Sequence, residues 1–240
     1  FAFIYVVGRL NVWGYHAVIL GIHLLAGLAL FGLIRRTLLL PRLRARYGPS
    51  ASWLALAISL LWLLHPLQTQ AVTYLSQRGE ALMGLWYLLT LYSVVRGAET
   101  TSARSWYAGA VVTALLGMGT KEVMVTAPLT VLLYDRVFLV SSLREALRKR
   151  RAFYGGLLIV LGVLGLLVLI SQKWFSIRAG LLLPDTHPLI YAATQPGVIL
   201  HYLRLALWPH PLVFDYAWPL ATTLRESLLP GAVLGGLLLA

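Results

Sequence analysis

The chain has 240 residues, of which 59% are apolar and 12% are charged, and its formal net charge is +12. A water-soluble domain of this length rarely combines so much apolar with so little charged sequence, so composition indicates an integral membrane protein. The sequence contains no cysteine, which excludes disulfides, thiolate metal sites and a cysteine nucleophile within these residues.

Runs of about 15 to 20 apolar residues recur along the chain, close to the ~20 residues that a helix needs to cross a ~30 Å hydrocarbon layer. No continuous alternation of period two indicates a barrel, and an open strand edge in lipid would leave backbone groups unpaired. We therefore predict an all-α, polytopic helical bundle with about seven to eight spans, forming a single transmembrane domain over residues 1–240 that is a fragment of a longer chain. The predicted spans are residues 14–34, 51–64, 81–95, 106–118, 123–139 and 153–171, an interrupted candidate at 190–208, and 228–240.

Lysine and arginine are concentrated in three connecting segments, which predicts how these helices are oriented. Residues 35–50, 96–105 and 136–151 hold five, two and six of them, thirteen of the twenty in the chain. Connections with such an excess face the cytoplasm, so the intervening connections are expected on the opposite side. The net charge is then mostly a topology signal with some contact to membrane lipid, and we expect no nucleic-acid partner.

With that orientation, several ionisable side chains fall near the non-cytoplasmic ends of the spans. They are His65, Arg78, Glu80, Lys121 and Glu122. An ionised group costs about 2.5 to 3.5 kcal/mol at full depth in a bilayer, and less near its edge, so such residues usually pair or bind something. Two interpretations stay open. The acids and cations neutralise one another across helices, or the guanidinium and ammonium groups hold a phosphate.

Four motifs follow one another along the chain. They are Trp13-Gly14-Tyr15-His16 with His23; His65-Pro66-Leu67-Gln68-Thr69-Gln70-Ala71-Val72 with Gln77-Arg78-Gly79-Glu80; Lys121-Glu122 ahead of Tyr134-Asp135; and a segment with Tyr202, Leu205, Pro209, Leu212, Asp215 and Tyr216. In this order they resemble the membrane domain of the transmembrane-and-tetratricopeptide-repeat glycosyltransferases, and the resemblance covers most of the chain.

The resemblance implies the C-type glycosyltransferase fold and an enzyme that transfers a sugar from a polyprenyl-phosphate carrier to an acceptor hydroxyl on the non-cytoplasmic face. We accordingly expect an integral protein of a bacterial inner membrane, with a polyprenyl-phosphate-linked sugar and a protein acceptor as partners. Carried over by position, the substrate-binding candidates are Arg78 and Lys121 for the carrier phosphate, Arg204 as a weaker third cation, Glu80 and Glu122 to orient the cations, His65 as a helix cap or a donor to phosphate or sugar, and Asp215 and Tyr216 for the sugar.

The catalytic residues themselves are expected outside this sequence. In the family an acidic pair lies in the first non-cytoplasmic loop, which would precede Phe1, and a divalent cation, if the enzyme uses one, would belong to that loop. Gln70 stands where the family usually has glutamate, which puts activity in doubt. No 34-residue period appears, so a tetratricopeptide domain would lie beyond Ala240 or be absent.

An alternative from a different class is a non-catalytic membrane subunit of a larger complex, with contacts to lipid or pigment. His16 and His23 are almost two helical turns apart and share one stripe, where they would either pack or ligate a haem or chlorophyll. Glycines such as Gly155 and Gly162 permit close helix contact in lipid but do not name the partner.

Overall fold

The structure is a computed structural model that describes residues 11–170, 188–213, 216–221 and 223–239. These residues form helices and the turns between them, and no strand occurs in the described part of the chain. The all-α prediction is therefore confirmed. The chain divides into two compact units, Phe1–Leu164 and Gly165–Ala240, which are described separately below, so a single domain over residues 1–240 stays a prediction.

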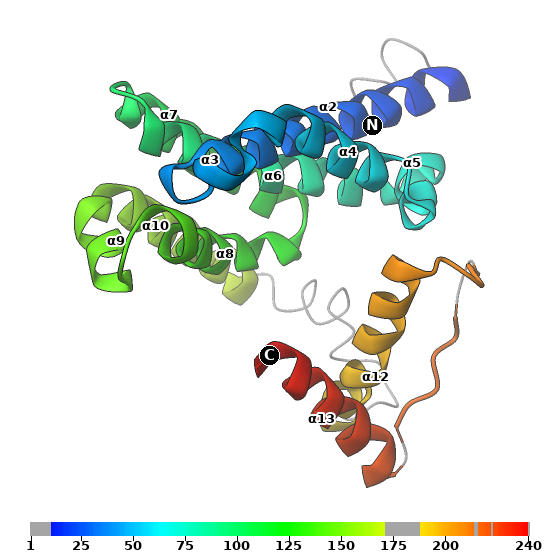
Figure 1. The fold of residues 1–240 in the computed structure, drawn as a ribbon. Helices are drawn as coiled ribbons and strands as arrows, with labels where there is room; N and C mark the ends of the chain where they lie inside the picture. The colour runs from blue at the N-terminus through cyan, green and yellow to red at the C-terminus, as the bar shows by residue number, and fades with distance from the viewer. Residues whose placement is uncertain (1–10, 171–187, 214–215, 222, 240) are drawn as a thin grey trace. The chain divides into compact units, whose positions relative to one another are not determined.

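Every predicted apolar segment is helical where the structure describes it (Figure 1). The elements of the first unit are α2 (Val12–Leu39), α3 (Pro41–Tyr47), η1 (Gly48–Ser50), α4 (Ala51–Leu63), η2 (Pro66–Gln68), α5 (Thr69–Thr73), η3 (Leu75–Gln77), α6 (Arg78–Glu99), α7 (Ala103–Thr120), η4 (Glu122–Thr126), α8 (Ala127–Tyr134), η5 (Asp135–Leu139), α9 (Leu143–Lys149) and the start of α10 (Arg151–Ile170). The second unit contains α12 (Pro188–Leu207) and α13 (Leu224–Leu239).

Fewer of these helices can cross a membrane than the seven to eight predicted. Among the described residues, α2 and α6 are long and apolar enough, and the number rises to four if two bent pairs each count as one span. The pairs are Pro41–Leu63 with Pro66–Thr73, bent by 51°, and Glu122–Leu139 with Leu143–Lys149, bent by 105°. Length explains part of the difference, because the 13 residues of α4 rise only about 20 Å against a ~30 Å hydrocarbon core.

The helices of the first unit alternate in direction, so that segments far apart in sequence meet at two ends. At one end, Arg36 of α2 forms an ion pair with Glu99 of α6 (2.6 Å), and Arg96 of α6 stacks over Trp106 of α7 (4.8 Å). We call this the arginine end, and it gathers the three segments that are predicted to be cytoplasmic. The opposite end carries Arg78, Glu80 and Lys121, and we call it the lysine end.

Exposed apolar side chains cover the outside of α2. Leu20, Leu24, Leu25 and Leu28 are 48%, 47%, 55% and 66% exposed. A helix that is apolar around most of its circumference, with leucines on its outer face, suits lipid better than water. Together with the two long apolar helices, this face is consistent with a membrane protein.

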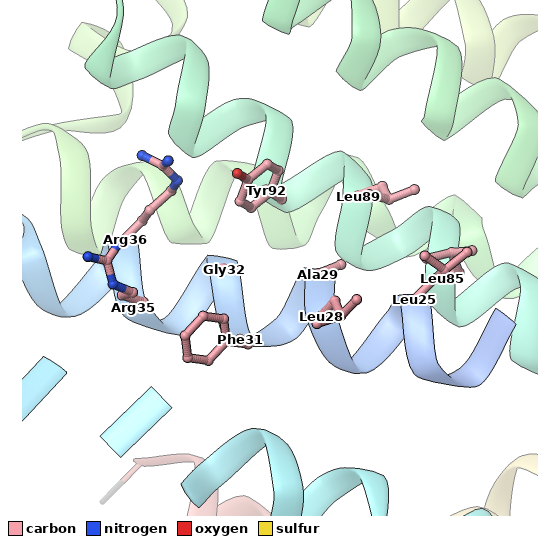
Figure 2. A pocket seen from close by; sticks show the side chains of 10 residues that line it. All are labelled: Leu25, Leu28, Ala29, Phe31, Gly32, Arg35, Arg36, Leu85, Leu89 and Tyr92. Carbon is pink, nitrogen blue, oxygen red and sulfur yellow. The ribbon is translucent and has the colours of Figure 1, made fainter. Parts of the chain in front are cut away.

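Helix α2 packs along α6 and leaves a cavity of about 480 Å³ between them (Figure 2). Figure 2 shows Arg35 and Arg36 at one end of this cavity and Leu25 and Leu85 at the other. The cations already have protein partners: Arg36 pairs with Glu99, and the Arg35 Nε donates to the Ser52 hydroxyl at 3.0 Å. The cavity is therefore mainly an apolar gap in helix packing.

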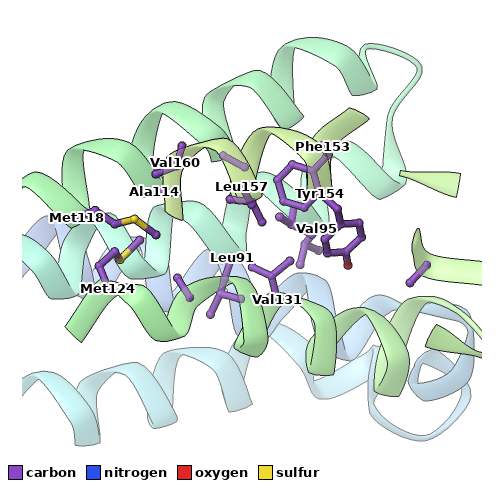
Figure 3. Close-up of a cluster of buried hydrophobic side chains, with 14 of the residues drawn as sticks. Leu91, Val95, Ala114, Met118, Met124, Val131, Phe153, Tyr154, Leu157 and Val160 are labelled. Carbon is purple, nitrogen blue, oxygen red and sulfur yellow. The ribbon is translucent and has the colours of Figure 1, made fainter. Parts of the chain in front are cut away.

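The core of the first unit lies where α6, α7, α8 and α10 meet (Figure 3). Ala110 and Ala114 of α7 are completely buried against Val94 and Val95 of α6. The small alanine side chains let the two helix backbones approach closely, which is how helices associate in lipid, where water exclusion contributes little. This packing fixes the rotation of α6 and α7 and so decides which side chains meet at the two ends.

Candidate functional site

The lysine end brings two of the predicted site residues into contact. Lys121 follows the last residue of α7, where its backbone N–H donates to the Gly117 carbonyl at 3.0 Å, and its ammonium group forms an ion pair with Glu80. Glu80 lies in the first turn of α6, where the helix dipole favours an acid. The two side chains remain 31% and 35% exposed, so this pair lies at an accessible rim.

Arg78 lies at the same end but makes a different interaction. It is the first residue of α6, two positions before Glu80, and side chains two positions apart project about 200° apart around a helix. Arg78 interacts electrostatically with Tyr15 of α2. The structure thus places Arg78 and Lys121 at one end of the unit, while their interactions are with different helices.

His65 and Glu122 border this rim. The Nδ1 atom of His65 accepts a hydrogen bond from the Leu67 N–H at 3.2 Å, so the histidine is the N-cap of η2. The sequence had left open a cap at the end of the second span or a role in binding phosphate or sugar, and the cap observed belongs instead to the helix that follows. Glu122 follows Lys121 directly, starts η4 and is half-buried. Three further predicted residues, Arg78, His65 and Glu122, therefore share the end of the unit that carries the Lys121–Glu80 contact.

His23 has a packing role. It is 5% exposed, its Nε2 lies 2.9 Å from the Leu63 carbonyl, and its ring lies 5.2 Å from that of Trp62. The last carbonyls of a helix lack partners within the helix, so His23 satisfies such a group at the end of α4. Its ring therefore has a structural partner on α4. Among the described residues, no three histidine or acidic side chains are grouped so that they could hold a metal ion.

The remaining candidates belong to the second unit. Arg204 of α12 donates from Nη2 to the His210 carbonyl at 3.1 Å, which ties the helix to the loop that follows it. The Tyr216 hydroxyl donates to the Pro211 carbonyl at 3.0 Å. Asp215 lies outside the described residues. Arg204 and Tyr216 therefore stabilise a local loop.

Aromatic rings surround His201, and of this cluster only Tyr216 was a candidate from the sequence. The His201 ring lies 4.7 Å from Tyr216 and 5.0 Å from Trp218. Its Nε2 atom is buried and has no hydrogen-bond partner in the described part of the chain. The sequence showed a histidine within an apolar helix and an aromatic segment after it, but their contact depends on a loop that folds back over α12.

The arginine end holds a buried charge that the sequence gave no role. Asp135 is completely buried and forms an ion pair with Arg150, and the Tyr154 hydroxyl donates to its second oxygen at 2.6 Å. The Arg150 Nε donates to the Tyr107 hydroxyl, also at 2.6 Å. A buried carboxylate with a cation and a hydroxyl on its two oxygens is a fully satisfied structural network.

Comparisons with known proteins provide no family for this chain: no protein-family model, no curated protein and no solved structure matches it.

Proposed function

We propose that the chain is the membrane domain of a C-type glycosyltransferase that takes a sugar from a polyprenyl-phosphate carrier and transfers it to an acceptor hydroxyl on the non-cytoplasmic face. The observation that carries the proposal is the contact between Lys121 and Glu80 at the lysine end. It joins residues of two separate motifs that resemble the transmembrane-and-tetratricopeptide-repeat family.

The strength of this ion pair matters for the proposal. Exposed or half-exposed pairs contribute only about 0 to 1 kcal/mol, because water screens both charges. A phosphate that hydrogen-bonds the ammonium group directly gains about 1.5 to 3 kcal/mol, so it competes favourably with Glu80 for Lys121. Glu80 then serves to hold the ammonium in place when no carrier is bound.

The chemistry assigned to this rim is the stabilisation of a leaving group. When the bond between sugar and phosphate breaks, negative charge grows on the lipid phosphate, and a fixed ammonium group beside it lowers the barrier. Arg78, in the same helical turn as Glu80, supplies a second cation from the α2 side. In the family that the motifs resemble, the acid–base carboxylates lie in the first non-cytoplasmic loop.

A second candidate function is a non-catalytic membrane subunit. It is favoured by the fact that these side chains already have partners within the protein. Lys121 pairs with a carboxylate, and His65 and His23 contact backbone groups. A domain held together in this way needs no ligand to satisfy these side chains. The two candidates differ in what they predict for Glu80.

The test measures binding of a polyprenyl phosphate to the purified protein in detergent, together with sugar transfer from the corresponding lipid-linked sugar. Lys121→Ala is expected to weaken carrier binding by about 10- to 100-fold, the loss of one charge-assisted hydrogen bond. Glu80→Gln is expected to preserve or strengthen binding, because it removes the competing carboxylate. Lys149→Ala is the control, since it breaks the Lys149–Glu145 ion pair on α9 and leaves the lysine end intact.

Unchanged carrier binding in both Lys121→Ala and Arg78→Ala would overturn the assignment. Equal, small losses of stability in Lys121→Ala and Glu80→Gln, without any effect on carrier binding, would instead support the subunit.

A further inference from the structure

A second cavity lies at the arginine end, between the start of α7, the end of α9 and the start of α10. Its volume is about 480 Å³, and five of its ten lining residues are basic. These five are Arg104, Arg148, Lys149, Arg150 and Arg151. Orientation of a membrane protein requires only an excess of positive charge in its cytoplasmic connections. It does not require these charges to line a single cavity. Here cations from separate helices line the same cavity.

Two of these cations are neutralised within the protein. Lys149 pairs with Glu145 at 2.7 Å, and Arg150 pairs with the buried Asp135.

The other three cations give the cavity its excess charge. Arg104, Arg148 and Arg151 are exposed, and none of them forms an ion pair within the described residues. Arg148 also lies within electrostatic range of Glu145, which already pairs with Lys149. The cavity between α2 and α6 differs in this respect, because its arginines are engaged by Glu99 and Ser52. An anion is therefore expected at the cavity beside α9.

The walls of the cavity indicate what kind of anion it accepts. Ala108, Val111 and Phe153 line it beside the arginines. Further along the same two helices, Leu115 of α7 and Leu158 of α10 are 47% and 67% exposed. A ligand that contacts both the arginines and these apolar side chains has a negatively charged headgroup and an apolar chain. The N-terminus of α10, a helix of 20 residues, adds favourable positive potential at the head.

We propose that this cavity binds the phosphate headgroup of an anionic phospholipid, with the acyl chains lying along the apolar faces of α7 and α10. The site is independent of the proposed glycosyl transfer, because it lies at the opposite end of the first unit from Lys121. Basic pockets between membrane helices are suited to this role, since each cation near the lipid surface adds about 1 kcal/mol of attraction. The proposal commits to a membrane lipid and excludes a free phosphate as the occupant.

The test measures which lipids remain bound when the protein is purified in detergent with phosphatidylglycerol and phosphatidylcholine, using native mass spectrometry. The variant Arg104→Gln/Arg148→Gln/Arg151→Gln removes the three cations without an ion-pair partner. The matched control Arg44→Gln/Arg46→Gln/Arg144→Gln removes the same charge from exposed arginines in the predicted cytoplasmic segments that do not line the cavity. Gel filtration and circular dichroism check that both variants fold.

Wild type and the control are expected to retain phosphatidylglycerol in preference to phosphatidylcholine. The cavity variant is expected to lose this preference, by about fivefold for each arginine removed. If the triple variant does not fold, Arg104→Gln alone is expected to give the fivefold loss. An equal loss in the control would overturn the proposal, because it would show diffuse attraction. Displacement of the lipid by excess inorganic phosphate would also overturn it, because it would show a site for phosphate alone.

Discussion

Asp135 and Arg150 form an ion pair inside the arginine end, with the Asp135 carboxylate completely buried. Asp135 begins η5, and Arg150 lies between α9 and α10, so the pair closes the turn that α9 makes between them. The Tyr154 hydroxyl donates a hydrogen bond to the Asp135 carboxylate. The Tyr107 hydroxyl accepts one from the Arg150 guanidinium. The network therefore ties three helical segments together at the end where the chain has most charge.

The first prediction concerns this buried pair. Asp135→Asn is expected to destabilise the first unit by about 3 to 5 kcal/mol, because it leaves the Arg150 guanidinium buried beside a neutral partner. Thermal unfolding in detergent, followed by circular dichroism, measures the effect. Glu99→Gln is the control, since it breaks the Arg36–Glu99 pair at the same end. Those side chains are 24% and 27% exposed, so a loss of no more than about 1 kcal/mol is expected. Similar losses in both variants would contradict the prediction.

The second prediction concerns the contact between α6 and α7. A β-carbon added at Gly97 would lie 2.8 Å from the Tyr107 ring. The hydroxyl of Tyr107 accepts a hydrogen bond from Arg150, which holds the ring in place. Gly97→Ala is therefore expected to cost about 1 to 3 kcal/mol through overpacking. Gly155→Ala is the matched control, because nothing lies within 4 Å of its added β-carbon. That variant is expected to be neutral or more stable by up to about 1 kcal/mol, since alanine favours helix.

Unfolding of both glycine variants is measured side by side in the same detergent. A Gly97→Ala protein as stable as the Gly155→Ala protein would show that Tyr107 moves aside without cost.

The third prediction is a pH dependence at α9. This helix carries four charged residues in seven and belongs to the segment 136–151 that is predicted to be cytoplasmic. The Lys149 ammonium and then the Ser141 N–H donate to the Glu145 carboxylate and lower its pKa below the ordinary 4.5. Because the folded form has the lower pKa, the carboxylate stabilises α9 above the ordinary pKa. This contribution is lost as the pH falls through the lowered value.

Carbon-13 NMR titration of the Glu145 side chain measures this directly. The expected midpoint is below 4.5 in the wild type, and it is expected to rise toward that value in Lys149→Ala. Arg144→Ala serves as the control and is expected to leave the midpoint unchanged. A midpoint at or above the ordinary value in the wild type would contradict the hydrogen bonds at this helix.

Helix positions were predictable from the sequence, because an apolar run is a local property of the chain. The segment predicted at residues 81–95 is α6, Arg78–Glu99, and the one predicted at 106–118 is α7, Ala103–Thr120. Breaks were harder to predict. Residues 123–139, expected as one span, lie within the helical segment Glu122–Leu139, but its winding changes from η4 to α8 to η5, with a proline in the first turn of α8. Proline lacks a backbone N–H, which favours the start of a helix at that point.

The partners of the charged residues were only partly predictable. Lys121 and Glu80 were both expected at one end, and mutual neutralisation was one of the two interpretations, but the sequence did not choose between Glu80 and Glu122. The choice depends on the rotation of α6 and α7, which Val94, Val95, Ala110 and Ala114 fix by packing. The buried position of Asp135 was missed for the same reason, since its partners are Tyr154 of α10 and Arg150 just before that helix.

The sequence by itself determined that this protein is helical and has helices apolar enough to cross a membrane, because both follow from how many apolar residues the chain carries and how regularly they recur. Its charges also predicted which connections share an end. Only the tertiary structure decided that Lys121 meets Glu80, that Arg150 meets Asp135, and that arginines from separate helices line one cavity. Those contacts join residues far apart in the chain, and the packing of helix on helix selects them.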